Sequence, residues 1–120
     1  MRIKTLKKLK IPEKQVLKAV LQFLDFVRIF HWRNNTGAVT TDKRFIRFGA
    51  AGSPDIIAIY QGRFIGIECK SSTGRQTAAQ KQFQIAVEAS KGIYILAKKV
   101  EDVADVIDAL RLIGRRRDSF

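Results

Sequence analysis

The sequence is poor in several residue types, and each shortage excludes a class of protein. A single cysteine in 120 residues excludes an internal disulfide framework and any zinc site built from several thiolates. No apolar run approaches the roughly 20 residues that span a bilayer. The basic start of the chain lacks the apolar stretch and cleavage site of a signal peptide. We therefore expect a soluble, cytoplasmic protein that has no membrane partner.

Acidic residues are also scarce. The chain has 11 Asp and Glu against 23 Lys and Arg, a formal net charge of +12. Such an excess attracts polyanions, because contacts with phosphates release condensed counterions, and nucleic acid is the commonest partner of this kind. Charge that merely keeps the protein soluble is the other interpretation.

The length and apolar content indicate one folded domain. An apolar fraction of 46% is typical of globular proteins, and 120 residues leave room for one core. We expect a single domain over 1–120, with a basic arm at 1–10 and a basic tail at 114–120.

Apolar spacing predicts an α/β domain, with a mixed sheet flanked by helices. The first helix follows Pro12 and carries Glu13, Val16 and Leu17 on the face that continues to Val20 and Leu24. The expected elements, in chain order, are that helix, a strand at 28–32, a loop-rich basic segment at 40–52 with a short strand at 45–48, strands at 55–60 and 63–70, a helix at 77–89, a strand at 93–97 and a closing helix through 103–110.

The two strands at 55–60 and 63–70 predict a β-hairpin around Gln61-Gly62. A two-residue loop sets Asp55 directly opposite Glu68, and a four-residue loop gives the same register. The two-residue period of a strand puts Lys70 on the same face as Glu68.

Two opposed carboxylates are the chemical feature of this hairpin. Directly opposed residues have Cβ atoms about 4.5–5.5 Å apart, where like charges destabilise each other unless a proton or a cation lies between them. Oxygen ligands suit Mg²⁺ or Mn²⁺, which polarises a phosphoryl oxygen and acidifies water. Lys70 would stabilise developing negative charge or help to activate the water. On spacing alone, a solvated Glu–Lys ion pair stays open as the alternative.

A longer pattern resembles a known family. The matching residues are Gly52-Ser53-Pro54-Asp55, then Ile56-Ile57-Ala58-Ile59, then Gly62 to Lys70, then Gly74-Arg75-Gln76-Thr77 and Gln80, and more loosely Glu13, Arg33-Asn34-Asn35, Gly37 and Lys91-Gly92. Together they closely resemble the VRR-NUC family, a branch of the PD-(D/E)-x-K nuclease superfamily, and the match covers most of the chain.

The resemblance implies a restriction-endonuclease-like α-β-β-β-α-β core and a Mg²⁺- or Mn²⁺-dependent DNA endonuclease. Asp55 and Glu68 would bind the metal, with the backbone carbonyl of Cys69 as a further ligand, and Lys70 would be the catalytic lysine. Glu13 would be an additional acidic metal-site residue, and Gln80 a glutamine of the catalytic site. Relatives include structure-selective DNA repair enzymes. Holliday-junction resolvases share the wider fold and are typically dimers, so a homodimer is expected.

Several of these residues have a second interpretation. Thr77 to Gln80 fits a capping box, in which the Gln80 side chain accepts from the helix N-cap instead of serving the site. Glu13 would also be favourable as an anion at the positive end of its helix. His31 is expected to be a packed strand residue, and Cys69 a core residue on the opposite face from Glu68.

Basic and polar residues near the expected site are candidates for contacts with nucleic acid. No base-reading helix is visible, so we expect recognition of phosphates and shape, on DNA with RNA as the alternative. A non-catalytic binding module is the alternative to an enzyme. The candidates are Arg33, Asn34, Lys43, Arg44, Arg47, Ser53 and Arg75, together with Arg63, Lys81 and the terminal Arg cluster.

Overall fold

A computed structural model of the chain describes residues 10–34, 37–40, 45–48 and 50–118. For 37–40, 45–48 and 115–118 it describes the backbone alone. The elements in chain order are α2 (Glu13–Phe26), β1 (Phe30–Arg33), β2 (Gly37–Thr40), β3 (Phe45–Phe48), β4 (Ile56–Tyr60), β5 (Arg63–Cys69), α3 (Ala78–Ala89), β6 (Ile93–Ala97) and α4 (Val100–Asp118).

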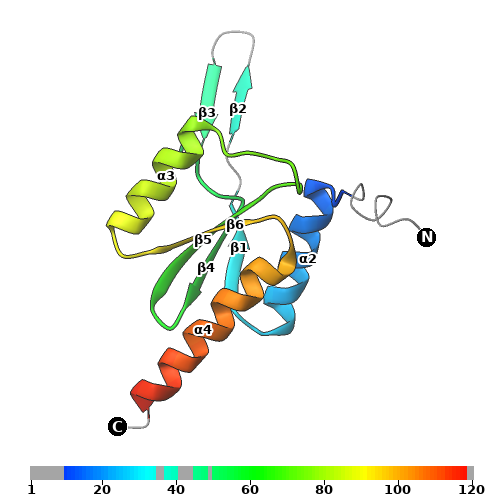
Figure 1. Ribbon diagram of the computed structural model, residues 1–120. Coiled ribbons are helices and arrows are strands. Elements are labelled where there is room, and N and C mark those ends of the chain that lie inside the picture. Colours follow the sequence, from blue (N-terminus) through cyan, green and yellow to red (C-terminus); the bar gives the residue numbers. More distant parts are fainter. Residues whose placement is uncertain (1–9, 35–36, 41–44, 49, 119–120) are drawn as a thin grey trace, which may run out of the picture.

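The protein is an α/β domain built on a four-stranded mixed sheet with three helices. The strand order is β1-β4-β5-β6, with β1/β4 and β4/β5 antiparallel and β5/β6 parallel. Helix α3 makes the crossover from β5 to β6, as a parallel pair requires. α2 and α4 lie on one side of the sheet and α3 on the other (Figure 1).

The core lies between the sheet and the pair α2 and α4. Every second residue of β4 and β5 points into it, including Ile56, Ala58, Ile65 and Ile67, all fully buried. The helices contribute apolar residues at helical spacing, as predicted, namely Val16, Val20, Leu24, Val103, Ile107 and Leu110. In the described part of the chain, no helix has the length and hydropathy needed to cross a membrane.

The predicted hairpin of β4 and β5 is confirmed. Tyr60 pairs with Arg63 and Ile56 with Ile67, as a two-residue loop requires. Gln61 and Gly62 have φ of 52° and 77°, the left-handed conformation of a tight hairpin turn. This register sets Asp55 and Glu68 opposite each other, one position beyond the Ile56–Ile67 pair.

Two local predictions about the first half of the chain need correction. The strand expected at 28–32 begins at Phe30, because Arg28 has a φ of 58° and the chain is still turning away from α2. The predicted short strand at 45–48 is present, but its partner strand Gly37–Thr40 was not predicted. β2 and β3 form a separate two-stranded sheet that projects past the end of β1 (Figure 1).

The closing helix is longer than the sequence pattern suggested. α4 runs to Asp118, so the backbone of 114–118, expected to belong to a basic tail, is helical. The arm expected at 1–10 lies almost wholly outside the described residues.

Candidate active site

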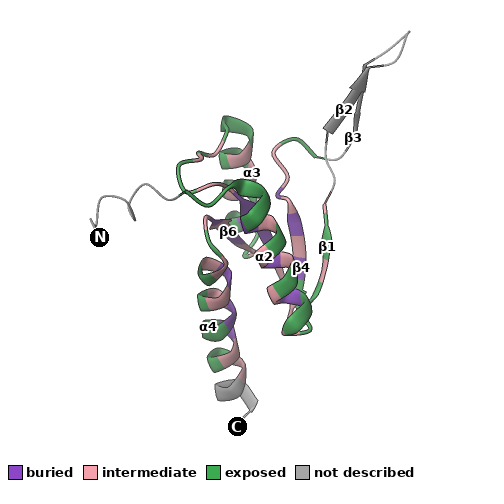
Figure 2. Cartoon of the chain, turned by 90° about the vertical axis from the view of Figure 1, so that its right-hand side faces the viewer, coloured by how far each residue is buried: buried purple, intermediate pink, exposed green. Residues whose placement is uncertain are grey.

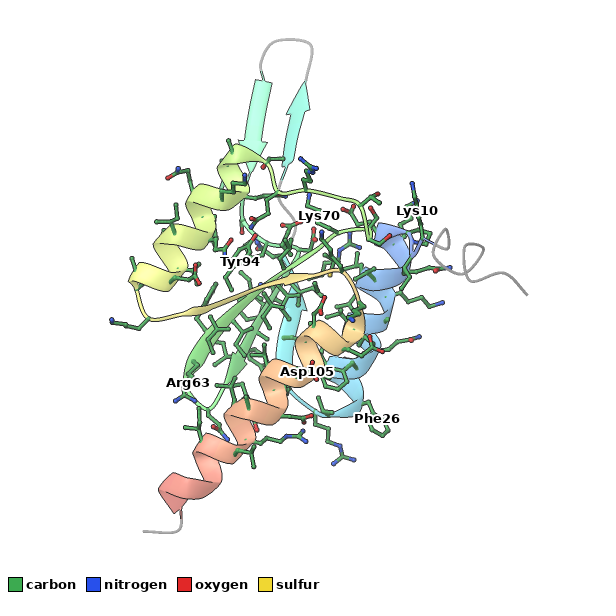
Figure 3. The ribbon with its side chains drawn as sticks, viewed as in Figure 1. Lys10, Phe26, Arg63, Lys70, Tyr94 and Asp105 are labelled. Atoms are coloured by element: carbon green, nitrogen blue, oxygen red, sulfur yellow. The ribbon has the colours of Figure 1, made fainter. Side chains whose placement is uncertain are left out.

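The site lies where β4 begins and β5 ends, at one end of the sheet. Lys70 marks this end in Figure 3, and Arg63, beside the hairpin turn, marks the opposite one. Asp55 directly precedes β4, and its carbonyl accepts a hydrogen bond from the Asn34 backbone at 2.8 Å. Lys70 directly follows β5, and its N–H donates to the carbonyl of Ala97 at 2.9 Å. Both backbones are therefore held by neighbouring strands.

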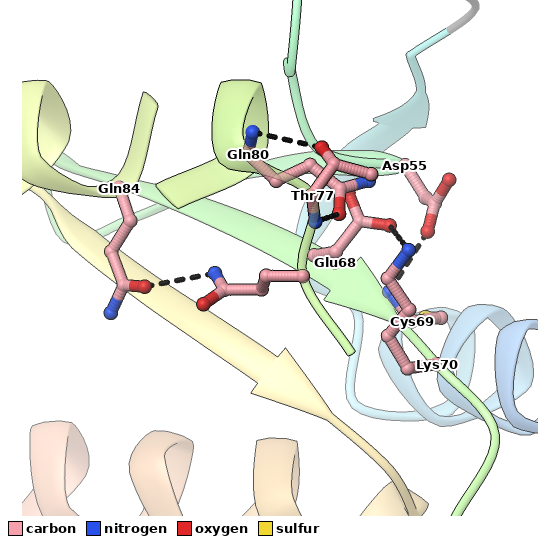
Figure 4. Close-up of polar contacts among 8 residues, drawn as sticks. Asp55, Glu68, Cys69, Lys70, Thr77, Gln80 and Gln84 are labelled. Carbon is pink, nitrogen blue, oxygen red and sulfur yellow. Dashed lines mark hydrogen bonds and ion pairs between the residues drawn. The ribbon is translucent and has the colours of Figure 1, made fainter. Parts of the chain in front are cut away.

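The Asp55 carboxylate is fixed by the backbone of the neighbouring strand. Its Oδ2 accepts the N–H of Cys69 at 2.8 Å (Figure 4). The Cys69 side chain itself points into the core and is fully buried, as the strand alternation predicted. Burial raises the pKa of the Cys69 thiol to about 12, so this sulfur is an apolar core atom. Cys69 thus serves the site through its main chain.

Glu68 is buried although it is ionisable. Only 3% of its surface is exposed, and its Oε1 is one of two buried side-chain polar atoms without a hydrogen bond among the described residues. The pKa of Glu68 is raised from 4.5 to about 8, chiefly by burial and in second place by the negative charge of Asp55. A buried carboxyl with an unpartnered oxygen beside a second carboxyl is costly unless a proton or cation joins them.

Lys70 is the nearby cation. Its Nζ lies 3.8 Å from Oε2 of Glu68, and its side chain is 14% exposed (Figure 4). The ammonium group lowers the pKa of Glu68, but burial and Asp55 outweigh it. The solvated surface ion pair that was open as an alternative does not describe this pair, because both side chains are largely buried.

The donor set fits a hard divalent cation. Two carboxylates from adjacent strands converge, one oxygen lacks a partner, and oxygen ligands are those that Mg²⁺ and Mn²⁺ prefer. In the described residues, no third Asp, Glu, His or Cys side chain joins them to make a set of three. Asp55 and Glu68 would hold the ion, with the carbonyl of Cys69 as the further ligand expected from the family resemblance.

Glu13 stands apart from this pair. It is the first residue of α2 and is exposed, and its charge reaches the site only far enough to raise the pKa of Glu68 and Cys69. The expected inward pose followed from its alignment with Val16, which is 1% exposed. The face of α2 that packs against the core therefore begins at Val16, and Glu13 lies outside it.

Gln80 occupies the capping position. Its Oε1 accepts the N–H of Thr77 at 2.9 Å, and its own N–H donates to Oγ1 of Thr77 at 3.2 Å. The capping box is therefore complete, and it begins α3 at Ala78. Of the two interpretations of Gln80, the structure displays the helix cap.

The loop before Asp55 is clamped from two sides. The Asn34 amide donates to Oγ of Ser53 and, at 3.0 Å, to the carbonyl of Pro54. On the other side, Gly52 has a φ of +75° and lies against the backbone of Ala79 in α3. Asn34 and Ser53, expected as contacts with nucleic acid, are hydrogen-bonded to each other here.

The remaining candidate contacts with nucleic acid are only partly described. Arg33 and Arg75 are exposed, Arg33 at the end of β1 and Arg75 in the loop before α3. Lys43 and Arg44 lie outside the described residues, and only the backbone of Arg47 is described, in β3. His31 is a packed strand residue, as predicted, because its Nε2 lies 3.1 Å from Oδ1 of Asp25 and its Nδ1 lies 2.6 Å from the carbonyl of Ile29.

Tyr94 was not predicted as part of the site. It is 9% exposed, pairs with Gly66 in the sheet, and lies on the same face as Glu68. Its hydroxyl is the second buried side-chain polar atom without a hydrogen bond in the described part of the chain. Burial raises the pKa of Tyr94, with contributions from the charges of Glu68 and Asp55. The signal available in the sequence was Tyr94 itself, the one side chain with a polar group in the apolar run of β6.

Compared with known protein families, the chain matches none, and no curated protein matches it either.

The raised pKa of Glu68 predicts how stability depends on pH without metal. Between about 4.5 and about 8 the folded protein keeps a proton that the unfolded chain has lost. The free energy of unfolding should therefore fall as the pH rises through this window. Urea denaturation in EDTA at several pH values checks this, with Glu68→Gln as the control that loses the decline. An equal decline in Glu68→Gln would contradict the assignment.

Proposed function

We propose that the protein is a Mg²⁺- or Mn²⁺-dependent DNA endonuclease that hydrolyses phosphodiester bonds. The single observation that carries the proposal is the buried Glu68, with an unpartnered oxygen, opposite Asp55 and 3.8 Å from the ammonium of Lys70. A module that only binds nucleic acid gains nothing from a buried Glu68 carboxylate opposite a second carboxylate where phosphates must approach.

The order of the elements supports a restriction-endonuclease-like core. When the β2–β3 hairpin is set aside, the chain runs α2, β1, β4, β5, α3, β6, which is the α-β-β-β-α-β order of that core. The residues quoted above as resembling the VRR-NUC family lie mostly on the loop, hairpin and helix that build the site. We infer membership of that family from these two features.

The residues of the site divide the chemical work. A divalent ion would polarise a phosphoryl oxygen and lower the pKa of the attacking water. Asp55 is oriented for ligation by the N–H of Cys69, and Glu68, which has a raised pKa, would give up its proton to hold a cation. Lys70 brings a positive charge to the position where negative charge develops on the phosphate.

The substrate we propose is duplex DNA that is branched, nicked or otherwise distorted. The net charge of +12 supports binding through phosphates, which does not select a sequence. We propose that the protein acts as a homodimer, since a body this small covers little duplex alone. This part rests on analogy with resolvases of the same wider fold.

A plasmid assay tests the proposed function. Supercoiled plasmid with Mg²⁺ or Mn²⁺ should be nicked or linearised, and EDTA should abolish the reaction because the carboxylates then hold no cation. A panel of linear duplex, nicked duplex, flap, four-way junction and single strand, and a matched RNA, then defines the substrate. Absence of cleavage with either metal, together with retained binding of DNA, would favour the non-catalytic binding module.

A further inference from the structure

Two exposed aromatic side chains lie side by side on the edge strand β1. Phe30 is 67% exposed and Trp32 is 42% exposed, with ring centroids 5.7 Å apart and planes tilted by 54°. Ile59, which pairs with Phe30 on β4, is 42% exposed beside them. We call these three residues the aromatic patch. Large apolar side chains that gather at a surface mark a binding site more often than an isolated one does.

The aromatic patch lies on the same face of the sheet as the carboxylates. Trp32 pairs with Ile57, and two residues further along the same strands the N–H of Asn34 donates to the carbonyl of Asp55. Side chains two apart on a strand share a face, so Asp55, Ile57 and Ile59 project together. Trp32 in β1 and Asn34, just after its end, are separated by about 7 Å along the extended chain. This is close to the rise of two nucleotides in one strand of DNA.

Helix α3 covers only the other half of this face. Its Val87 contacts Gly92 at the start of β6, and Phe83 and Val87 line a shallow pocket with Phe64 of β5. On the half formed by β1 and β4, the side chains of the aromatic patch remain exposed. β1 is an edge strand of the sheet (Figure 2). The aromatic patch is therefore accessible from the end of the sheet that carries the site.

The distribution of charge favours a polyanion over a second protein. Seven of the 11 acidic residues lie on α2 and α4, which cover the opposite face of the sheet. Arg28 is exposed just before β1, and Arg33 is exposed at the end of β1, where its side chain lies on the α2 side of the sheet. A protein seated on the aromatic patch would also lie about two residues of strand from Asp55, where it would obstruct the substrate.

We propose that Phe30 and Trp32 form a stacking site for an unpaired base of the strand that is cut at Asp55 and Glu68. Aromatic rings beside a positively charged path are the means by which proteins hold single strands without reading sequence. The inference deepens the proposed function by naming its substrate class, DNA with a single-stranded segment beside the cleaved bond. Stacking itself requires neither metal nor cleavage.

The only tryptophan of the chain makes the proposal directly measurable. Trp32 is that residue, so its emission reports on its own ring. Titration of the protein in EDTA with a short oligothymidylate should quench the emission saturably, and a blunt duplex of equal length should quench it much less. Emission unchanged at saturating oligothymidylate would overturn the proposal.

Variants separate stacking from simple apolar contact. Trp32→Leu and Phe30→Leu should each weaken binding of a labelled oligothymidylate about tenfold, since each removes one stacking ring. Trp32→Phe keeps a ring and should retain most of the affinity. Leu112→Ala removes a side chain that is 61% exposed on α4, on the opposite side of the sheet, and should leave affinity unchanged. Equal affinity of Trp32→Leu and Trp32→Phe would contradict stacking.

Sedimentation of the same variants tests whether a second copy of the chain, and not DNA, occupies the aromatic patch. If Trp32→Leu and Phe30→Leu turn a dimer into a monomer and leave oligothymidylate binding intact, the aromatic patch is a contact between copies of this chain and the proposal is wrong. The stacking proposal and the proposed nuclease activity can fail separately. Quenching without metal-dependent cleavage would leave the stacking site and remove the nuclease, whereas cleavage without quenching would do the reverse.

Discussion

Replacing Lys70 with alanine is expected to lower the rate of metal-dependent DNA cleavage about a hundredfold or more, while binding of DNA changes little. The Lys70 ammonium lies 3.8 Å from Glu68 in a largely buried position, so in the proposed nuclease its charge would act at the reacting phosphate. For binding it is one of 23 basic side chains. Asp55→Ala should have the same effect, because it removes a carboxylate of the site. Single-turnover cleavage and a mobility-shift assay in EDTA measure the two quantities.

Lys91→Ala is the matched control for Lys70→Ala. Lys91 is exposed and precedes β6 at the opposite end of the sheet, so the variant removes the same charge without touching the site. It should cut at close to the wild-type rate. Wild-type rates for both Lys70→Ala and Asp55→Ala, after rigorous purification, would mean that the site is elsewhere. A loss of binding that matches the loss of cleavage would make Lys70 a binding residue.

Gly52→Ala is expected to lower the free energy of unfolding by about 3 kcal/mol, through a left-handed backbone and a steric clash. Gly52 has a φ of +75°, and a Cβ there would lie 2.2 Å from the carbonyl oxygen of Ala79. That atom belongs to the main chain of α3 and cannot rotate away. The loop leads directly into Asp55, so the variant that still folds should also cleave poorly. Urea denaturation followed by circular dichroism measures the first effect.

Gly62→Ala separates the cost of the left-handed backbone from the cost of the steric clash. Gly62 has nearly the same φ, +77°, but a Cβ there would meet nothing within 4 Å. This variant therefore carries only the conformational cost, about 1 kcal/mol. Equal losses in the two variants would show that the contact between Gly52 and Ala79 contributes nothing.

The hairpin could be predicted from the sequence because local chemistry determines it. Gln61-Gly62 accommodates a two-residue turn, the turn fixes the register, and the register brings Asp55 opposite Glu68. The same holds for the cap of α3, where Thr77 and Gln80 satisfy each other within four residues. In both cases the decisive contacts are close along the chain, so a pattern of residue types is enough.

Features that depend on distant contacts were not predictable in this way. The order β1-β4-β5-β6 joins segments far apart in the sequence. β2 carries no alternation of its own and exists through its pairing with β3. Periodicity identifies which residues of α3 share a face but not how closely that face approaches the sheet, and only Val87 of the helix is buried. The exposure of Glu13 has the same origin.

Glu68, Cys69 and Lys70 are consecutive, and they divide between two environments. The Cys69 side chain is wedged among the apolar residues of the interior, while its neighbours on both sides serve the site. Because one strand carries the chemical groups and a residue of the core, a shift of β5 displaces both at once. Thermal inactivation of such a protein would coincide with its global melting, and substitutions beneath β5 would alter turnover without touching any substrate.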